Sequence, residues 1–401
     1  MSYLFKSTKL KKLFFLMSVI ILISLLPAFI IPFAPDKVSD FYYREVTYSK
    51  VAQDLIGNSK DATLINMFKY VANSLHTYKN SKVVDRNSFI DLVRGVGWCD
   101  QQAFLLMHLL NKSGVSKTRL RDVQSHTYSE VRVGNKWVVI DPYSSLIFLD
   151  NDGQYLGIED LKNPNIDDFM GIIKASSKSS KPLSFSNNYQ NIFIENEIRW
   201  KNGIGPEFLD YRSYNLSRRL FEVYGAYALL VFGDRYYYWL QDQYLESDRV
   251  KKISDQGSNW IRNYPETNDN AFRLFYKARN YILANRVESA TNSYKLIIKE
   301  FPNSYWAEES KYNLAILYYK DANYLTSKEL LLDLLLNYKR KDNHTSIDKN
   351  RNDINDLVAY YLGLISLEEG NIIKAKEYFL MSDYKYSQIE LYKIDTFDGK
   401  I

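Results

Sequence analysis

Cys99 is the only cysteine among the 401 residues of the chain, in the stretch GVGWCDQQAF. A single cysteine excludes an intrachain disulfide and a metal site built from several cysteines. Two interpretations remain, a buried structural thiol or a nucleophile, and composition alone favours the first because free cysteine is among the most buried residue types. A nucleophile would attack an acyl group as the thiolate, and it would need a base that a third polar group orients.

Four histidines could supply the base, and their positions distinguish them. His126 begins a stretch of alternating residues, which is typical of a strand. His108 follows Cys99 by nine residues on a predicted helix, about half a turn round its axis, so it faces away from the thiol. His76 belongs to an earlier predicted helix and His344 to a polar insert. The pattern therefore favours His126.

A helix start positions the thiol. The stretch WCDQQAFLLMHLLNKSGV predicts a helix that begins near Cys99 and ends at Gly114, a usual C-terminal breaker. The preceding RGVG does not favour a helix, and the unpaired N–H groups of a first turn favour the negative charge of a thiolate. An earlier helix is predicted over residues 61–79 from the helical spacing of its apolar residues, Leu64, Met67, Phe68, Val71 and Leu75.

Residues 126–143 predict a β-hairpin. HTYSEVRV alternates, Gly134-Asn135 supplies a two-residue turn, and KWVVIDPY is rich in β-forming residues. His126 begins the first strand and Asp141 ends the second. Cross-strand neighbours lie about 5 Å apart, which suits an imidazole–carboxylate hydrogen bond. A helix followed by antiparallel strands indicates an α+β domain.

The order Cys, His, Asp on helix, strand and strand resembles the transglutaminase-like domain of the papain superfamily, and we expect this domain over residues 45–173. The resemblance rests on GWCDQQA, on SGV at the helix end, and on HTYSEVRVGNKWVVIDP. The matching positions in the last stretch are His126, Tyr128, Glu130-Val131, Trp137 and Asp141-Pro142.

This resemblance implies a role for each of three residues. Cys99 would be the nucleophile, with its backbone N–H as one oxyanion donor, His126 the base and later the acid, and Asp141 the group that fixes the imidazole tautomer. A second oxyanion donor is unassigned, and neither a metal nor an organic cofactor is called for. A thioester would be resolved by hydrolysis or by acyl transfer. We expect Glu130 and Trp137 to serve packing and strand pairing.

The C-terminal third is helical and repetitive. Residues 263–278 align with residues 300–315 at an offset of 37 residues. This resembles the tetratricopeptide repeat, expected as an all-α array over residues 245–390, and a plain helical bundle is the alternative. A polar insert over residues 339–355 would separate the second and third units. Small residues are expected where paired helices approach most closely, namely Ala278, Ala290, Ala315, Gly363 and Ala375.

An uncharged apolar run occupies residues 13–33. As a helix it would be about 30 Å long, which matches one hydrocarbon core. The four lysines within residues 1–12 predict that this basic segment is cytoplasmic and that the bulk of the chain is extracytoplasmic (periplasmic or extracellular), behind a single-pass transmembrane anchor in the cell membrane. A cleaved signal peptide is the alternative, and it would export the chain as well.

Two segments connect these regions. Residues 174–188 are rich in serine and lysine and predict a linker, followed by a helical connecting region over residues 189–244. Within it, residues 221–233 are apolar but too short to cross a bilayer, so we interpret them as a core helix rather than a second membrane segment. The net charge is +5. The basic N-terminal segment supplies most of this charge, and we expect no nucleic-acid partner.

Together these patterns predict a membrane-anchored, extracytoplasmic cysteine enzyme that acts on a protein or peptide-like substrate. The preference for hydrolysis over crosslinking comes from analogy with the family. The alternative is an inactive scaffold whose helical repeats bind a protein partner.

Overall fold

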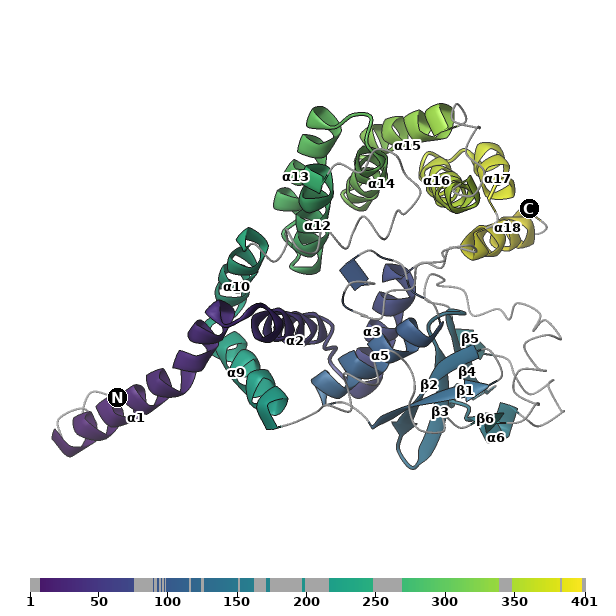
Figure 1. Cartoon of the computed structure of the whole chain (residues 1–401). Coiled ribbons are helices and arrows are strands. Elements are labelled where there is room, and N and C mark those ends of the chain that lie inside the picture. Colours follow the sequence, from purple (N-terminus) through teal and green to yellow (C-terminus); the bar gives the residue numbers. More distant parts are fainter. Residues whose placement is uncertain are drawn as a thin grey trace.

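The computed structural model has a protruding N-terminal helix, a central part of helices and one antiparallel sheet, and an arc of further helices (Figure 1). This order confirms the predicted sequence of an apolar helix, an α+β part and a helical C-terminal part. The structure describes residues 8–75, 89, 92–93, 95, 97, 99–114, 117–123, 126–150, 152–161, 171–173, 197–198, 216–247, 269–338, 348–382 and 384–398.

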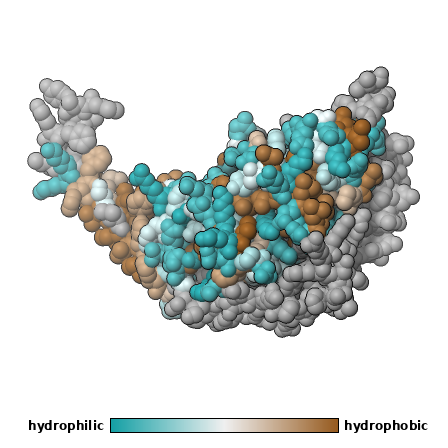
Figure 2. All heavy atoms as spheres, turned by 90° about the horizontal axis from the view of Figure 1, so that it is seen from above, coloured by the Kyte–Doolittle hydropathy of each residue, from teal (hydrophilic) through white to brown (hydrophobic). Residues whose placement is uncertain are grey.

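Helix α1 (Thr8–Ile30) contains most of the uncharged run, and a short 3₁₀ helix, η2 (Ile31–Phe33), continues it. Residues 11–33 are long and apolar enough to cross a membrane. Most of the large apolar side chains here are exposed, and Figure 2 shows them along the protruding arm. Near the end of α1, Leu25 and Ala28 are buried against the rest of the protein.

Three helices form the base of the central part, namely α2 (Asp36–Asp54), α3 (Lys60–Ser74) and α5 (Cys99–Ser113). Helix α3 begins after Ser59, whose side chain accepts a hydrogen bond from a first-turn backbone N–H at 3.0 Å. This confirms the predicted helix as far as Ser74, but Leu75 is already extended, and residues 76–79 lie outside the described residues. Its predicted apolar stripe is buried throughout, at Leu64, Met67, Phe68, Val71 and Leu75.

One antiparallel sheet has the strand order β5-β4-β3-β2-β1-β6. Strands β2 and β3 form the predicted hairpin, and Gly134 has the positive φ of 59° that its turn requires. Strand β6 lies within the region predicted as a helical connection, because residues 197–198 pair with β1. The elements are β1 (Thr118–Val123), β2 (His126–Val133), β3 (Lys136–Asp141), β4 (Leu146–Leu149), the short helix α6 (Ile158–Leu161), β5 (Gly171–Ile173) and β6 (Glu197–Ile198).

Helix α5 packs on β2, and a direct polar contact joins them, because Ser129 Oγ donates to the Ala103 carbonyl at 2.9 Å. The helix ends before Gly114, whose φ is 66°, as predicted. Its fully buried apolar residues include Leu105, Leu106, Leu109 and Leu110. This packing fixes the cysteine helix on the sheet that carries the other two candidate residues.

Helices α9 (Leu216–Phe232) and α10 (Asp234–Glu246) confirm the helical part of the connecting region. The interpretation of residues 221–233 as a core helix holds for one face only. Ala228 and Leu229 are buried, whereas Val223 and Leu230 are mostly exposed.

The C-terminal arc consists of helices that pack against their neighbours in the chain (Figure 1). The prediction of a polar insert over residues 339–355 is wrong in part, because α16 begins at Asp348. Ile354 lies on the same buried face as Leu357 and Val358, so the helix extends into that stretch. The helices are α12 (Asp269–Leu283), α13 (Val287–Glu300), α14 (Tyr305–Lys320), α15 (Tyr324–Tyr338), α16 (Asp348–Glu368), α17 (Ile372–Leu380) and α18 (Lys385–Asp398).

The small residues lie at helix–helix contacts, as predicted. Ser327 Oγ of α15 donates to the Ala315 carbonyl of α14 at 2.8 Å, and a Cβ at Gly363 would lie 2.4 Å from the Phe379 ring. The four predicted alanines are fully buried, namely Ala278, Ala290, Ala315 and Ala375. A larger side chain would therefore not fit at these positions.

The central part and the first helices of the arc share one apolar core, which includes residues of α2, α5, α10, α12 and α14. Polar contacts cross it as well, since Tyr43 donates to Asn280 Oδ1 at 3.0 Å and Gln241 Nε2 to the Asn280 carbonyl at 2.8 Å. Through these contacts the helices of the arc pack directly on the central part. The predicted linker 174–188 lies outside the described residues.

Candidate active site

Cys99 is the first residue of α5, and its side chain is half-buried. Upstream, Gly95 has a φ of 77°, which interrupts any helix there and favours glycine. Gln102 Nε2 donates to the Gly97 carbonyl at 2.9 Å and ties the incoming backbone to the first turn. The local sequence thus places the thiol at the N-terminus of a helix, where the helix dipole favours a negative charge.

His126 is the first residue of β2 and Asp141 the last of β3. His126 Nε2 and Asp141 Oδ2 are 2.8 Å apart, and the carboxylate is fully buried. The register pairs Ser129 with Ile140, so Asp141 lies opposite Tyr128 rather than His126. The expected direct cross-strand pair is therefore corrected to a diagonal one, which side chains of this length can bridge.

Cys99 lies beside His126, and its thiol interacts with the imidazole electrostatically and as a hydrogen-bond partner. Asp141 engages Nε2 of the same ring. The three predicted residues therefore form one continuous chain of thiol, imidazole and carboxylate, contributed by α5, β2 and β3.

The neighbours of His126 decide its protonation. Burial by itself lowers the pKa of a histidine, because it disfavours the charged imidazolium. The hydrogen bonds to Asp141 and Cys99, with the electrostatic attraction of both groups, outweigh burial and raise the pKa of His126 to about 10. The imidazole is therefore protonated at neutral pH.

The loop after β3 supports the Asp141 carboxylate, and this contact was not predicted from the sequence. The Ser144 backbone N–H donates to Asp141 Oδ1 at 3.2 Å, so each carboxylate oxygen has a partner. The Tyr143 ring centre lies 5.6 Å from that of His126. The signal was present in DPYSS, because an aspartate often accepts a hydrogen bond from the backbone of the turn that follows it.

Glu130 and Trp137 serve the sheet, as expected. Glu130 is fully buried and accepts hydrogen bonds from Arg119 and Arg121 of the adjacent strand, the latter at 2.7 Å. The Arg119 guanidinium also lies 4.2 Å from the centre of the Trp137 ring. These contacts connect β1, β2 and β3.

The remaining histidines lie elsewhere. His108 Nε2 is 3.6 Å from Glu45 Oε2, which pairs with Lys112 Nζ at 2.6 Å, so this histidine faces α2. His76 and His344 lie outside the described residues. Within the described part of the chain, no cluster of three or more histidine, cysteine or carboxylate side chains could hold a metal ion.

The arc of helices contacts both flanks of the site. Arg279 of α12 donates from Nε to the Val93 carbonyl at 2.6 Å, shortly before Cys99. Tyr386 of α18 shares a hydrogen bond with the Ser145 hydroxyl, in the loop that supports Asp141. No local sequence signal could have predicted these contacts.

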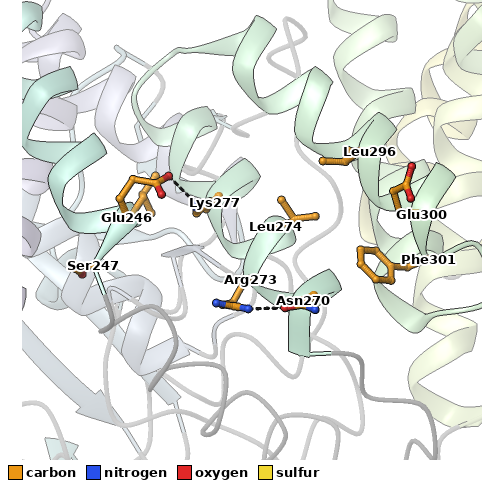
Figure 3. Close-up of a pocket in the computed structure, with 10 residues that line it drawn as sticks. Glu246, Ser247, Asn270, Arg273, Leu274, Lys277, Leu296, Glu300 and Phe301 are labelled. Carbon is orange, nitrogen blue, oxygen red and sulfur yellow. Dashed lines mark hydrogen bonds and ion pairs between the residues drawn. The ribbon is translucent and has the colours of Figure 1, made fainter.

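A hollow of about 490 Å³ lies between α10, α12 and α13 (Figure 3). Lys277 and Glu246 form an ion pair of 2.6 Å across it, and Arg273 hydrogen-bonds Asn270. A second hollow, of about 550 Å³, lies between the start of α3 and the β2–β3 turn. None of the three candidate residues lines either hollow.

No family model, no curated protein and no solved structure matches this chain. A thiol, a protonated imidazole and a buried carboxylate that follow one another in space can support nucleophilic attack and proton transfer.

Proposed function

We propose that this protein is a membrane-anchored, extracytoplasmic cysteine enzyme of the transglutaminase-like type that acts on amide bonds of proteins or peptides. The observation that carries the proposal is the hydrogen-bonded chain of Cys99, His126 and Asp141. A lone half-buried thiol would be uninformative. A thiol at a helix start, beside an imidazole that a buried carboxylate orients, is the arrangement that acyl transfer requires.

The reaction begins when Cys99 Sγ attacks the carbonyl carbon of the amide. The protonated His126 stabilises the thiolate and then gives its proton to the leaving nitrogen as the C–N bond breaks. The acyl group stays on sulfur as a thioester. Neutral His126 next takes a proton from water or an acceptor amine, which attacks the thioester carbon, and the sulfur leaves as thiolate.

Asp141 would act as a positioning residue for the imidazole. Its contact with Nε2 would hold the imidazole beside Cys99 and favour the imidazolium. The Ser144 N–H holds the second oxygen, so the carboxylate cannot easily turn away. The first N–H groups of α5, including that of Cys99, would stabilise the oxyanion.

Helix α1 supports the proposed location, because residues 11–33 are long and apolar enough to span a bilayer. The lysines before it would stay in the cytoplasm, and the site would then meet extracytoplasmic proteins or peptides. The papain-like assignment of the α+β part and the repeat assignment of the arc belong to the same proposal.

A second candidate function is a scaffold in which the arc binds a protein partner. The hollow of Figure 3 favours it, because it offers charged and apolar side chains together at the end of α10. This function would not require a reactive thiol.

Labelling of Cys99 with iodoacetamide at neutral pH, followed by mass spectrometry, tests the enzyme proposal. We expect the full chain to react far faster than a free thiol, and the His126→Gln variant to lose this advantage. His108→Gln is the matched control, because His108 lies on the same helix as Cys99 but faces Glu45. Equal slow labelling of all three proteins would contradict the enzyme and favour the scaffold.

A further inference from the structure

Helix α9 has one face that is firmly packed. Ala228 is fully buried and Leu229 is 3% exposed. Gly225 lies so close to α2 that a Cβ there would be 2.5 Å from Val46 Cγ2. This face is therefore an interior contact with no room for another partner.

The opposite face of α9 is apolar and exposed. Val223 and Leu230 are 61% and 78% exposed, and Leu220 and Val231 are 43% and 46% exposed. At about 100° per residue these four side chains fall within one third of the helix circumference, away from Gly225. Isolated exposed apolar residues need no explanation, but four of them on one face over about three turns, beside the half-buried Tyr227, form a patch of the kind that marks an interaction surface.

The C-terminal end of α9 contacts the end of α1. Phe232 lies on the same side of α9 as Gly225 and is 41% exposed, and its ring packs edge-on against Phe29 with centroids 5.6 Å apart. The Tyr236 hydroxyl donates to the Ala28 carbonyl at 2.8 Å and fixes the junction. Figure 1 shows α9 running across the direction of α1 rather than along it.

Aromatic side chains gather where α1 ends. Trp239 of α10 lies 5.2 Å from the Phe29 ring and 6.2 Å from the Phe33 ring, and Phe33 is 67% exposed. Tryptophan is enriched at the level of lipid headgroups, where a spanning helix leaves the bilayer. The end of α1 thus has the composition of a membrane interface, and the C-terminal end of α9 meets α1 at this level.

We propose that α9 lies in the surface of the lipid bilayer, with Leu220, Val223, Leu230 and Val231 buried among the headgroups and upper acyl chains. The inference rests on the proposed membrane anchoring by α1. If α1 stands along the membrane normal, a helix that crosses its direction at its end lies in the interface plane, as amphipathic interfacial helices do. Two contacts, α1 and α9, would then hold the active site at a set orientation beside the membrane.

Fluorescence quenching on the full chain tests this orientation. Single cysteines at Leu230→Cys and Val223→Cys, in a Cys99→Ser background, carry an NBD label in vesicles of phosphatidylcholine and phosphatidylglycerol. The matched control is Leu325→Cys on α15, where the native side chain is 70% exposed. We expect nitroxide-labelled lipid to quench the α9 labels about threefold more than the Leu325 label.

A label at Leu16→Cys on α1 separates the two proposals. Quenching by lipid at both α1 and α9 supports the interfacial helix. If lipid quenches the label on α1 but leaves the labels at positions 230 and 223 as weakly quenched as the control, the interfacial helix alone is overturned. If lipid fails to quench the label on α1 as well, the membrane anchor and the inference that depends on it are both overturned.

Discussion

A histidine–carboxylate contact lies near each end of α5, and the two contacts differ in almost every respect. At the start, His126 and Asp141 meet beside a half-buried thiol. Two to three turns along, His108 contacts Glu45 of α2 with no thiol near, and both side chains are buried. The same pair of residue types thus forms a candidate site at one end and an interhelical polar contact at the other.

The electrostatics of the two ends are opposite. Interactions with Asp141 and Cys99 overcome burial and raise the pKa of His126 to about 10. Burial would raise the pKa of Glu45, but His108 and Lys112 hold it well below its usual range. A histidine–carboxylate pair can therefore support nucleophilic attack only where a third, reactive group remains accessible beside it.

Removal of the thiol or its base should have the largest effect and separate the two ends directly. Cys99→Ala should abolish thioester formation, and His126→Gln should lower turnover roughly 10⁶-fold, because both attack and proton transfer depend on them. His108→Gln should change thermal stability but leave turnover of a fluorogenic peptide amide within a few-fold of wild type. Equal losses of turnover in the His108 and His126 variants would contradict the assignment of different roles to these two histidines.

Asp141→Asn should lower turnover by roughly 10³- to 10⁴-fold while the nucleophile remains. The raised pKa of His126 stabilises the folded protein below about pH 6.5, its unfolded value, and this stabilisation is lost as pH rises through about 10. In Asp141→Asn the imidazole should titrate at lower pH. NMR titration of the His126 ring measures the shift, and an unchanged titration would contradict the proposed role of Asp141.

Glu45→Gln should destabilise the fold by about 3–5 kcal/mol, because it leaves the Lys112 charge without its carboxylate. The depressed pKa of Glu45 means that its contribution is present above its unfolded value, near pH 4.3, and is lost as pH falls through the lower folded value. Urea unfolding at pH 7 and at low pH measures both effects. A variant as stable as wild type at pH 7 would show that this end of α5 needs no carboxylate.

Tyr386→Phe should have the smallest effect, a loss of about 1 kcal/mol or a few-fold in turnover, because it removes one hydrogen bond between α18 and the loop after Asp141. The test is a comparison of kcat and of its pH profile with wild type. If only the active-site end of α5 depends on the arc, labelling of Cys99 should slow while global stability hardly changes. A change in stability alone would assign Tyr386 to packing.

Local sequence patterns were enough to predict the hairpin and the start of the cysteine helix. Glycine before Cys99 and apolar periodicity after it place the thiol at a helix start, and the turn at Gly134 brings β2 and β3 together. The small residues of the arc also follow from sequence spacing. These features depend on backbone preferences and side-chain periods within one or two neighbouring elements.

The contacts between residues far apart in the chain could be found only in the folded structure. Arg279 and Val93 are 186 positions apart, and Ser145 and Tyr386 are 241 apart. It also decided the diagonal register of His126 and Asp141, the partner of His108, and which face of α9 is exposed. Such contacts arise from the way whole helices and sheets fill a common core, and no short pattern in the chain encodes that packing.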